Sequence, residues 1–179
     1  STPPSGAGDG SCTVQNSGNC AVDNMKKCGS WNPQEASQIC MLESAGGKLD
    51  IPSGSDRCKL PDGKIISWSW GLFQFNVATG SASPEFSECK NVVIPGNCIE
   101  RGVTRGGTGY CKMKNCTYGS GGEPAFNRCV AAITKSANSL DRQIKQACNL
   151  YSHRSAAKNW CDWESSAVTC KVKPLGFCR

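Results

Sequence analysis

Apolar residues recur at helical spacing in several stretches of the chain. Between residues 32 and 44 they stand three or four positions apart, separated by polar residues, as on a helix with one buried face. These positions are Ala36, Ile39, Cys40 and Leu42. Asn32 suits the N-cap, Pro33 suits the first helical position, and the glycines at 46 and 47 are typical of a helix end. We therefore predict a helix from Asn32 to Ser44.

The same periodicity predicts further helices. Residues 21–28 form a short one, because Val22, Met25 and Cys28 stand three apart. A longer pair follows over residues 123–137 and 139–151, and a last short helix over residues 154–163 carries two tryptophans. These helices make up most of the predicted regular structure.

The stretch between the two groups of helices has a different pattern. Asp62-Gly63 between apolar residues predicts a β-hairpin, and Trp68 and Trp70 alternate with serines as in an extended segment. Residues 81–122 are rich in glycine, serine and cysteine and lack helical periodicity, so we predict an irregular insertion pinned by disulfides. Within it, residues 115–117 (Asn-Cys-Thr) match the acceptor sequence for N-glycosylation, although a half-cystine occupies the middle position.

Fourteen cysteines among 179 residues point to an oxidising compartment. The even number allows up to seven disulfides, whose connectivity the sequence does not reveal. A structural zinc site is the competing use of cysteine. The closest pair is Cys111 and Cys116, the only histidine is His153, and no double Cys-x2-Cys pattern exists. We expect disulfides, no metal and no cofactor.

Charge and polarity exclude two classes of partner. The net charge is +6, but the basic residues are scattered and form no stripe with aromatics, so we do not expect nucleic acid as a partner. No run approaches the about 18 apolar residues of a membrane span. A positive surplus would help the protein approach an anionic surface such as a bacterial wall. We expect residues 1–11 to be a flexible polar lead-in, and residues 12–179 have the length of one domain.

One carboxylate stands in a position suited to acid–base chemistry. Glu43 falls in the last turn of the predicted helix, beside Leu42, where the helix dipole disfavours an anion. Burial and the dipole would both raise the pKa of this carboxyl, as a general acid near neutral pH requires. The residues alone leave a second interpretation open, an ordinary surface glutamate near a helix end.

Two motifs in this region resemble those of a known family. Glu43-Ser44 is followed by Gly46-Gly47 and, further along the chain, by Gly71-Leu72-Phe73-Gln74. This order is similar to that of the lysozyme superfamily, in its soluble lytic transglycosylase and goose-type branch, and the likeness covers residues 30–80. It implies a disulfide-rich α+β fold, mainly α, in which a lysozyme-like helical domain carries a small β-hairpin lobe beside a cleft.

The resemblance also implies roles for particular residues. Glu43 would be the general acid, and Ser44 would hydrogen-bond near its carboxyl. Gln74 would hold an N-acetyl sugar. Tyr151 lies in an imperfect Ala-x-x-x-Tyr element and would orient Glu43, with a core tyrosine as the alternative.

Two aromatic residues would line the cleft. Phe73 stands where methionine is common in the family and would keep an apolar wall. Trp70 would offer a platform for the face of a sugar, although paired tryptophans are also frequent in protein cores. Both are therefore candidate substrate-binding residues.

A second catalytic carboxylate is less clearly indicated. Asp50, Asp56 and Asp62 follow Glu43, and Asp56 is our candidate because it lies mid-loop with no turn to form. A nucleophile would lie about 5 Å from the acid, and an inverting base about 6.5–9.5 Å away. In the transglycosylase branch none is needed, since the 2-acetamido and 6-hydroxyl groups of muramic acid attack the anomeric carbon. Both routes stay open.

Together these features predict a secreted or periplasmic monomer that cleaves the MurNAc-β-1,4-GlcNAc bond of peptidoglycan, as a lytic transglycosylase or a muramidase. Chitin, another N-acetylhexosamine glycan, is the competing substrate. Two other classes of function stay open. One is a catalytically silent module that binds carbohydrate or cell wall. The other is a disulfide-rich structural or defence protein in which both motifs occur by coincidence.

Overall fold

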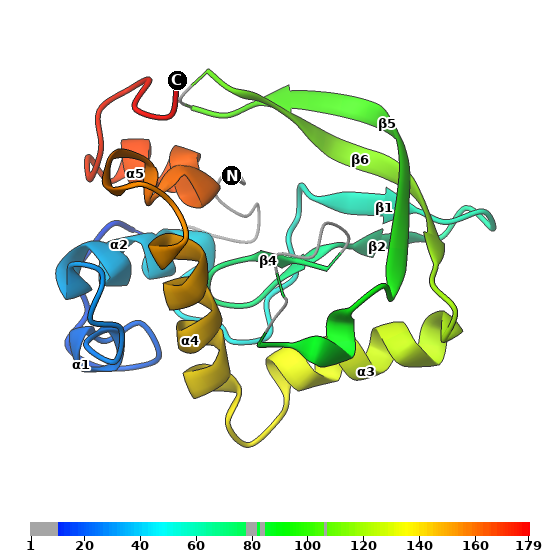
Figure 1. The fold of residues 1–179 in the computed structure, drawn as a ribbon, viewed down its shortest axis with the longest axis horizontal. Coiled ribbons are helices and arrows are strands. Elements are labelled where there is room, and N and C mark those ends of the chain that lie inside the picture. Colours follow the sequence, from blue (N-terminus) through cyan, green and yellow to red (C-terminus); the bar gives the residue numbers. More distant parts are fainter. Residues whose placement is uncertain (1–10, 78–81, 83–84, 106) are drawn as a thin grey trace.

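The computed structural model describes residues 11–77, 82, 85–105 and 107–179 and has an α+β fold. Within these residues lie five α-helices, a mixed four-stranded sheet and a two-stranded sheet. Most of the helices gather on the left of Figure 1, and the long strands lie on the right. None of the helices in the described ranges has both the length and the apolar character that crossing a membrane requires.

The N-terminal helices form as predicted. Helix α1 spans Val22–Met25 and α2 spans Pro33–Glu43. The side chain of Asn32 caps α2 by accepting hydrogen bonds from the backbone N–H groups of Gln34 and Glu35. Capping chemistry and apolar spacing thus determine α2 locally.

The C-terminal helices agree with the prediction only in part. Helices α3 (Gly122–Thr134) and α4 (Ser139–Ser152) form the expected pair. The single helix predicted over residues 154–163 is wrong, because this stretch holds two 3₁₀ turns, Ala156–Lys158 and Cys161–Trp163. Helix α5 follows at Glu164–Thr169. The two tryptophans in this stretch, Trp160 and Trp163, are buried and pack edge-on against each other, with ring centroids 5.6 Å apart.

The predicted hairpin around Asp62-Gly63 is present. Strands β1 (Arg57–Lys59) and β2 (Ile65–Ser67) pair antiparallel, and Gly63 takes the left-handed φ of +88° that the turn requires. Strand β1 also pairs in parallel with β6, giving the sheet order β2-β1-β6-β5. Two short strands, β3 (Ser69–Trp70) and β4 (Phe75–Asn76), form the second sheet.

The described residues between 81 and 122 do not form the irregular insertion that the sequence predicts. After a 3₁₀ turn at Ser87–Cys89 they form a long hairpin of β5 (Val93–Val103) and β6 (Gly109–Tyr118). Apolar and polar residues do not alternate along β5, because most of the strand is exposed and its register with β6 shifts at several points. The sequence therefore does not indicate a strand here. The predicted pinning is confirmed by three disulfides: Cys58–Cys116, Cys89–Cys129 and Cys98–Cys111.

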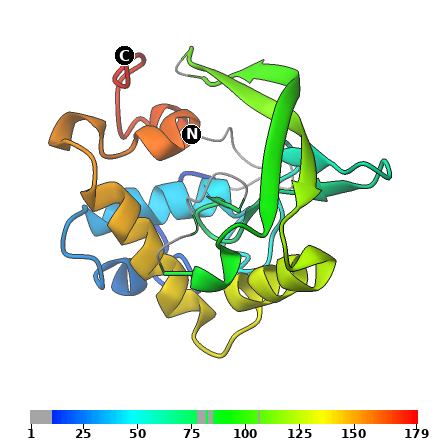
Figure 2. The same ribbon diagram turned by 45° about the vertical axis from the view of Figure 1, so that its right-hand side comes forward.

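The far end of this hairpin is fastened to the first turn of α5. The hydroxyls of Thr104 and Thr108 donate hydrogen bonds to the two carboxyl oxygens of Glu164, at 2.5 and 3.1 Å. The backbone N–H of Arg105 donates to the hydroxyl of Ser165 at 3.0 Å. The hairpin therefore arches from the side of α3 to that of α5 (Figures 1 and 2).

Disulfides join distant parts of the chain. All fourteen cysteines lie in the described ranges and are paired, which confirms the predicted use of cysteine in disulfides, at the maximum of seven bridges, and leaves no free thiol. The remaining four bridges are Cys12–Cys170, Cys20–Cys40, Cys28–Cys148 and Cys161–Cys178. Such pairing is typical of proteins that fold in an oxidising compartment and fits a secreted protein.

Candidate active site

Glu43 is the last residue of α2, and its side chain is fully buried. The helix ends here because the next residues enter the left-handed region, with φ of +54° at Ala45, +96° at Gly46 and +101° at Gly47. Glycine adopts such angles without a steric penalty, which accounts for the paired glycines. The structure thus places a carboxyl at the C-terminal end of a buried helix, where the sequence analysis placed it.

Ser166 of α5 holds the carboxyl of Glu43. Its hydroxyl donates to Oε2 at 2.6 Å, and Ser166 is itself fully buried. Burial favours the neutral acid, whereas a donated hydrogen bond favours the carboxylate, so the two effects oppose each other. The sequence analysis missed this residue because 123 positions separate the pair and no motif surrounds it. The one available signal is a serine pair between the apolar Trp163 and Ala167.

Ser44 fixes the turn that follows Glu43. Its hydroxyl donates to the carbonyl of Cys40 at 2.5 Å and accepts from the N–H of Gly47 at 2.9 Å. These bonds satisfy a carbonyl at the helix end and an amide of the turn. Ser44 therefore acts on the backbone around Glu43 and supports its carboxyl only indirectly.

Gln143 of α4 holds the turn formed by residues 71–74. Its Oε1 accepts from the N–H of Leu72 at 2.6 Å, and its Nε2 donates to the carbonyls of Leu49 and Ile133 at 3.0 and 2.9 Å. Gly71 has a φ of +89°, and a Cβ at this position would collide with Oε1 of Gln143. The glycine of the motif is thus required by the close approach of Gln143, a residue that the sequence analysis did not single out.

Gln74 lies within the same turn and is 5% exposed. Its Nε2 donates to the carbonyls of Gly71 and Ile51 at 2.9 and 3.2 Å. Its Oε1 is buried without a hydrogen-bond partner in the described structure. A buried acceptor of this kind is costly unless a donor reaches it. Gln74 therefore offers one vacant acceptor beside the turn.

Residues 163–166 connect Glu43 to this turn. The indole N–H of Trp163 donates to the carbonyl of Phe73 at 2.8 Å, and Ser166 binds Glu43 three residues later. The start of α5 therefore touches both motifs on which the family resemblance rests. Long-range packing of α5 brings the two motifs into one structural unit.

Two predicted cleft residues lie in an aromatic cluster. Phe73 is 1% exposed and stacks on Trp31, with ring centroids 5.5 Å apart. Tyr151 is half-buried and packs edge-on against Trp160, with centroids 4.7 Å apart. Phe73 therefore belongs to the core, and Tyr151 packs on the edge of this cluster with part of its surface exposed. In the described structure Ser166 makes the contact with Glu43 that the resemblance implied for Tyr151.

Trp70 keeps part of its surface available. It is half-buried, and its indole N–H donates to the carbonyl of Ser67 at 3.1 Å. Its neighbour Trp68 is 2% exposed and lies under the ammonium of Lys114, which is 4.4 Å from the ring centroid. Of the two tryptophans, Trp70 is therefore the one that retains surface for a sugar.

Asp56 lies in a separate polar cluster beside the sheet. It is 2% exposed, and its Oδ2 accepts from the hydroxyl of Ser69 at 3.0 Å. Burial raises the pKa of this carboxyl from 3.8 to about 6, against the lowering effects of Ser69, Trp68 and Lys114. Among the described residues no hydrogen bond or ion pair joins Asp56 to Glu43. The hydrogen bond from Ser69 therefore fixes the carboxyl of Asp56 against the second sheet.

Two further findings concern metal binding and related proteins. Over the ranges it describes, no three side chains of the metal-binding types come together as a metal site. Searches against protein-family models, curated proteins and solved structures found no match to this chain.

Proposed function

We propose that the protein is a glycosidase that cleaves the MurNAc-β-1,4-GlcNAc bond of peptidoglycan, with Glu43 as general acid. The observation that carries this proposal is the buried carboxyl of Glu43 at the end of α2, held by Ser166. Glycosidic cleavage requires a positioned carboxylic acid that protonates the leaving oxygen. Burial favours the protonated form that this step needs. The Glu-Ser and Gly-Leu-Phe-Gln motifs support the same assignment.

Recognition of the substrate would involve Gln74 and Trp70. The N-acetyl group of each sugar carries an amide N–H, the donor that the vacant Oε1 of Gln74 lacks. The exposed part of the Trp70 indole offers an apolar surface to a pyranose ring. An N-acetylhexosamine therefore matches both groups.

The one-glutamate route accounts best for the surroundings of Glu43. Glu43 protonates the glycosidic oxygen as the bond to the anomeric carbon breaks, and the 2-acetamido oxygen closes on that carbon. The ionised Glu43 then takes the proton of the 6-hydroxyl, whose oxygen attacks the anomeric carbon and displaces the acetamido oxygen. The product is a 1,6-anhydro sugar. Asp56 has no part in this scheme, which agrees with its bonds to the sheet.

Access to Glu43 is a requirement of the proposal. The side chain has no exposed surface in this structure, so a glycan would have to displace atoms that cover it before the reaction. The same burial favours one alternative, a silent module that binds wall glycan without cleaving it. Glu164 shows that this protein also uses a buried glutamate as a purely structural acceptor.

The test is the muropeptide profile released from purified wall sacculi. We expect anhydro-muramic ends, which lie about one water (18 Da) below reducing ends. Glu43→Gln should fold normally and release nothing, whereas the exposed control Glu123→Gln should match the parent protein. Unchanged release by Glu43→Gln would remove Glu43 from the mechanism. Tight binding to sacculi without release by the parent protein would establish the silent module instead.

A further inference from the structure

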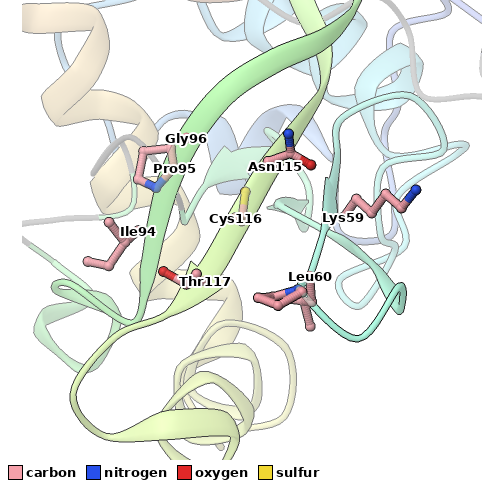
Figure 3. Close-up of a pocket in the computed structure, with 9 residues that line it drawn as sticks. Lys59, Leu60, Ile94, Pro95, Gly96, Asn115, Cys116 and Thr117 are labelled. Atoms are coloured by element: carbon pink, nitrogen blue, oxygen red, sulfur yellow. The ribbon is translucent and has the colours of Figure 1, made fainter.

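The glycosylation sequence Asn115-Cys116-Thr117 lies on the open surface of β6. Asn115 and Thr117 are exposed, while Cys116 is buried and bridged to Cys58. Alternate residues of a strand point to opposite faces, so the asparagine and threonine share the outer face and the disulfide lies behind them. Figure 3 shows Asn115, Cys116 and Thr117 along this strand. The half-cystine at the middle position therefore does not obstruct the Asn115 side chain in the folded protein.

A hollow of about 340 Å³ adjoins Asn115. It lies between the β1–β2 turn and the start of β5 (Figure 3). Its floor and walls are mainly apolar and include Leu60, Pro61, Ile94 and Pro95. Ile94 is 48% exposed there, and Gly96 adds no side chain that would fill the space. The sheet thus exposes apolar surface directly beside the acceptor asparagine.

We propose that Asn115 is an N-glycosylation site and that the first N-acetylglucosamine covers this hollow. In the reaction, Nδ2 of Asn115 forms a bond to the anomeric carbon of an oligosaccharide carried on a polyprenyl diphosphate. The bond from that carbon to the phosphate oxygen breaks, the polyprenyl diphosphate leaves with the bonding electrons, and the amide loses one proton. The secretory machinery of a glycosylating cell supplies this donor.

Several features converge on this site. The sequence contains one Asn-x-Ser/Thr sequence, and it occurs at an exposed position beside an apolar hollow. Seven disulfides place folding in an oxidising compartment, where N-glycans are attached. The C–H face of a pyranose would pack on the exposed Pro61, Ile94 and Pro95, while its hydroxyls reach water. This proposal is independent of Glu43 and of the proposed glycosidase activity.

Attachment is tested by secreting the protein from a glycosylating eukaryotic host. We expect a heterogeneous mass that collapses on treatment with peptide-N-glycosidase, with Asn115 converted to aspartate. Thr117→Ala should abolish the glycan, and the matched control Thr117→Ser, which keeps the hydroxyl, should retain it. A secreted parent protein with its unmodified mass, or a glycan that persists in Thr117→Ala, would overturn the assignment.

The position of the first sugar is tested by comparing two enzymatic trims of one high-mannose preparation. An endoglycosidase leaves a single N-acetylglucosamine on Asn115, and peptide-N-glycosidase leaves none. The single N-acetylglucosamine should keep the hollow covered. The thermal unfolding midpoint of the protein that carries it should therefore exceed that of the fully trimmed protein by about 2–4 °C. Ile94→Thr should reduce this difference. Equal unfolding midpoints for the two trimmed proteins would refute the position of the first sugar in the hollow.

Discussion

Replacing Asp56 with asparagine should stabilise the protein at neutral pH. The carboxyl is 2% exposed and its pKa is raised from 3.8 to about 6, so the folded state disfavours its charge. Asparagine has nearly the same shape and no charge. Its amide can donate to the hydroxyl of Ser69, which is able to reverse its role, and its oxygen can take the place of Oδ1 near the Trp68 indole.

The magnitude follows from the two pKa values. A difference from 3.8 to about 6 corresponds to about 3 kcal/mol, at 1.36 kcal/mol per pH unit. Since the folded value is the higher one, the contribution of Asp56 to stability is fully present below pH 3.8 and is lost as pH rises through about 6. Asp56→Asn should therefore gain about 3 kcal/mol at pH 8 and only about 0.5 kcal/mol at pH 4.

The assay is thermal unfolding with all disulfides oxidised, measured at pH 8 and pH 4. For a chain of this size the gain at pH 8 corresponds to an increase of about 6–12 °C in the midpoint. The control is Asp50→Asn, which removes an exposed aspartate from the same region and should shift the midpoint little at either pH. A gain that is equal at both pH values, or a loss at pH 8, would show that burial does not govern Asp56.

Three further substitutions test the contacts around Glu43 and the hairpin. Ser166→Ala removes a donor that favours the carboxylate form of Glu43, so the alkaline limb of the pH–rate profile for glycan cleavage should move to higher pH. Ser166→Thr keeps the hydroxyl and should restore the limb, and a limb that does not move in Ser166→Ala would contradict this role. Gln143→Ala leaves three buried backbone groups without their hydrogen-bond partner and should lower the free energy of unfolding by at least about 3 kcal/mol in denaturant titration. A smaller loss would refute the role of Gln143 in holding the turn. Glu164→Ala removes two hydrogen bonds from the hairpin tip, so trypsin should cut after Arg105 about ten- to hundredfold faster; an unchanged rate of cleavage would show that Glu164 does not hold the tip.

The sequence predicts the structure well where local chemistry decides it. Helix α2 begins at a capping asparagine and ends at left-handed glycines, so its bounds and the position of Glu43 follow from neighbouring residues. The hairpin at Asp62-Gly63 follows in the same way from a turn that needs a positive φ. In both cases the determining residues lie within a few positions of the feature.

The sequence does not predict contacts between residues that lie far apart along the chain. Strand β5 shows no alternation because both of its faces are largely exposed, and two disulfides fasten the β5–β6 hairpin in place of a buried apolar face. Gln143 contacts Leu72 across 71 positions, and Ser166 contacts Glu43 across 123. The roles proposed for Phe73 and Tyr151 have the same limitation, because the sequence around an aromatic residue is the same whether the residue packs in a core or lines a cleft.

Helix α5 links the two parts of the molecule that the sequence leaves unconnected. Glu164 and Ser165 bind the tip of the β5–β6 hairpin, and Ser166, the next residue, binds Glu43. Three consecutive residues on a short helix cannot move independently, so a displacement of the hairpin tip is transmitted to the hydrogen bond on the carboxyl. A substrate that pressed on the hairpin would therefore alter the balance between the acid and carboxylate forms of Glu43. This coupling requires α5 to move as a rigid unit, and amide hydrogen exchange in α5 that is unaffected by Glu164→Ala would exclude it.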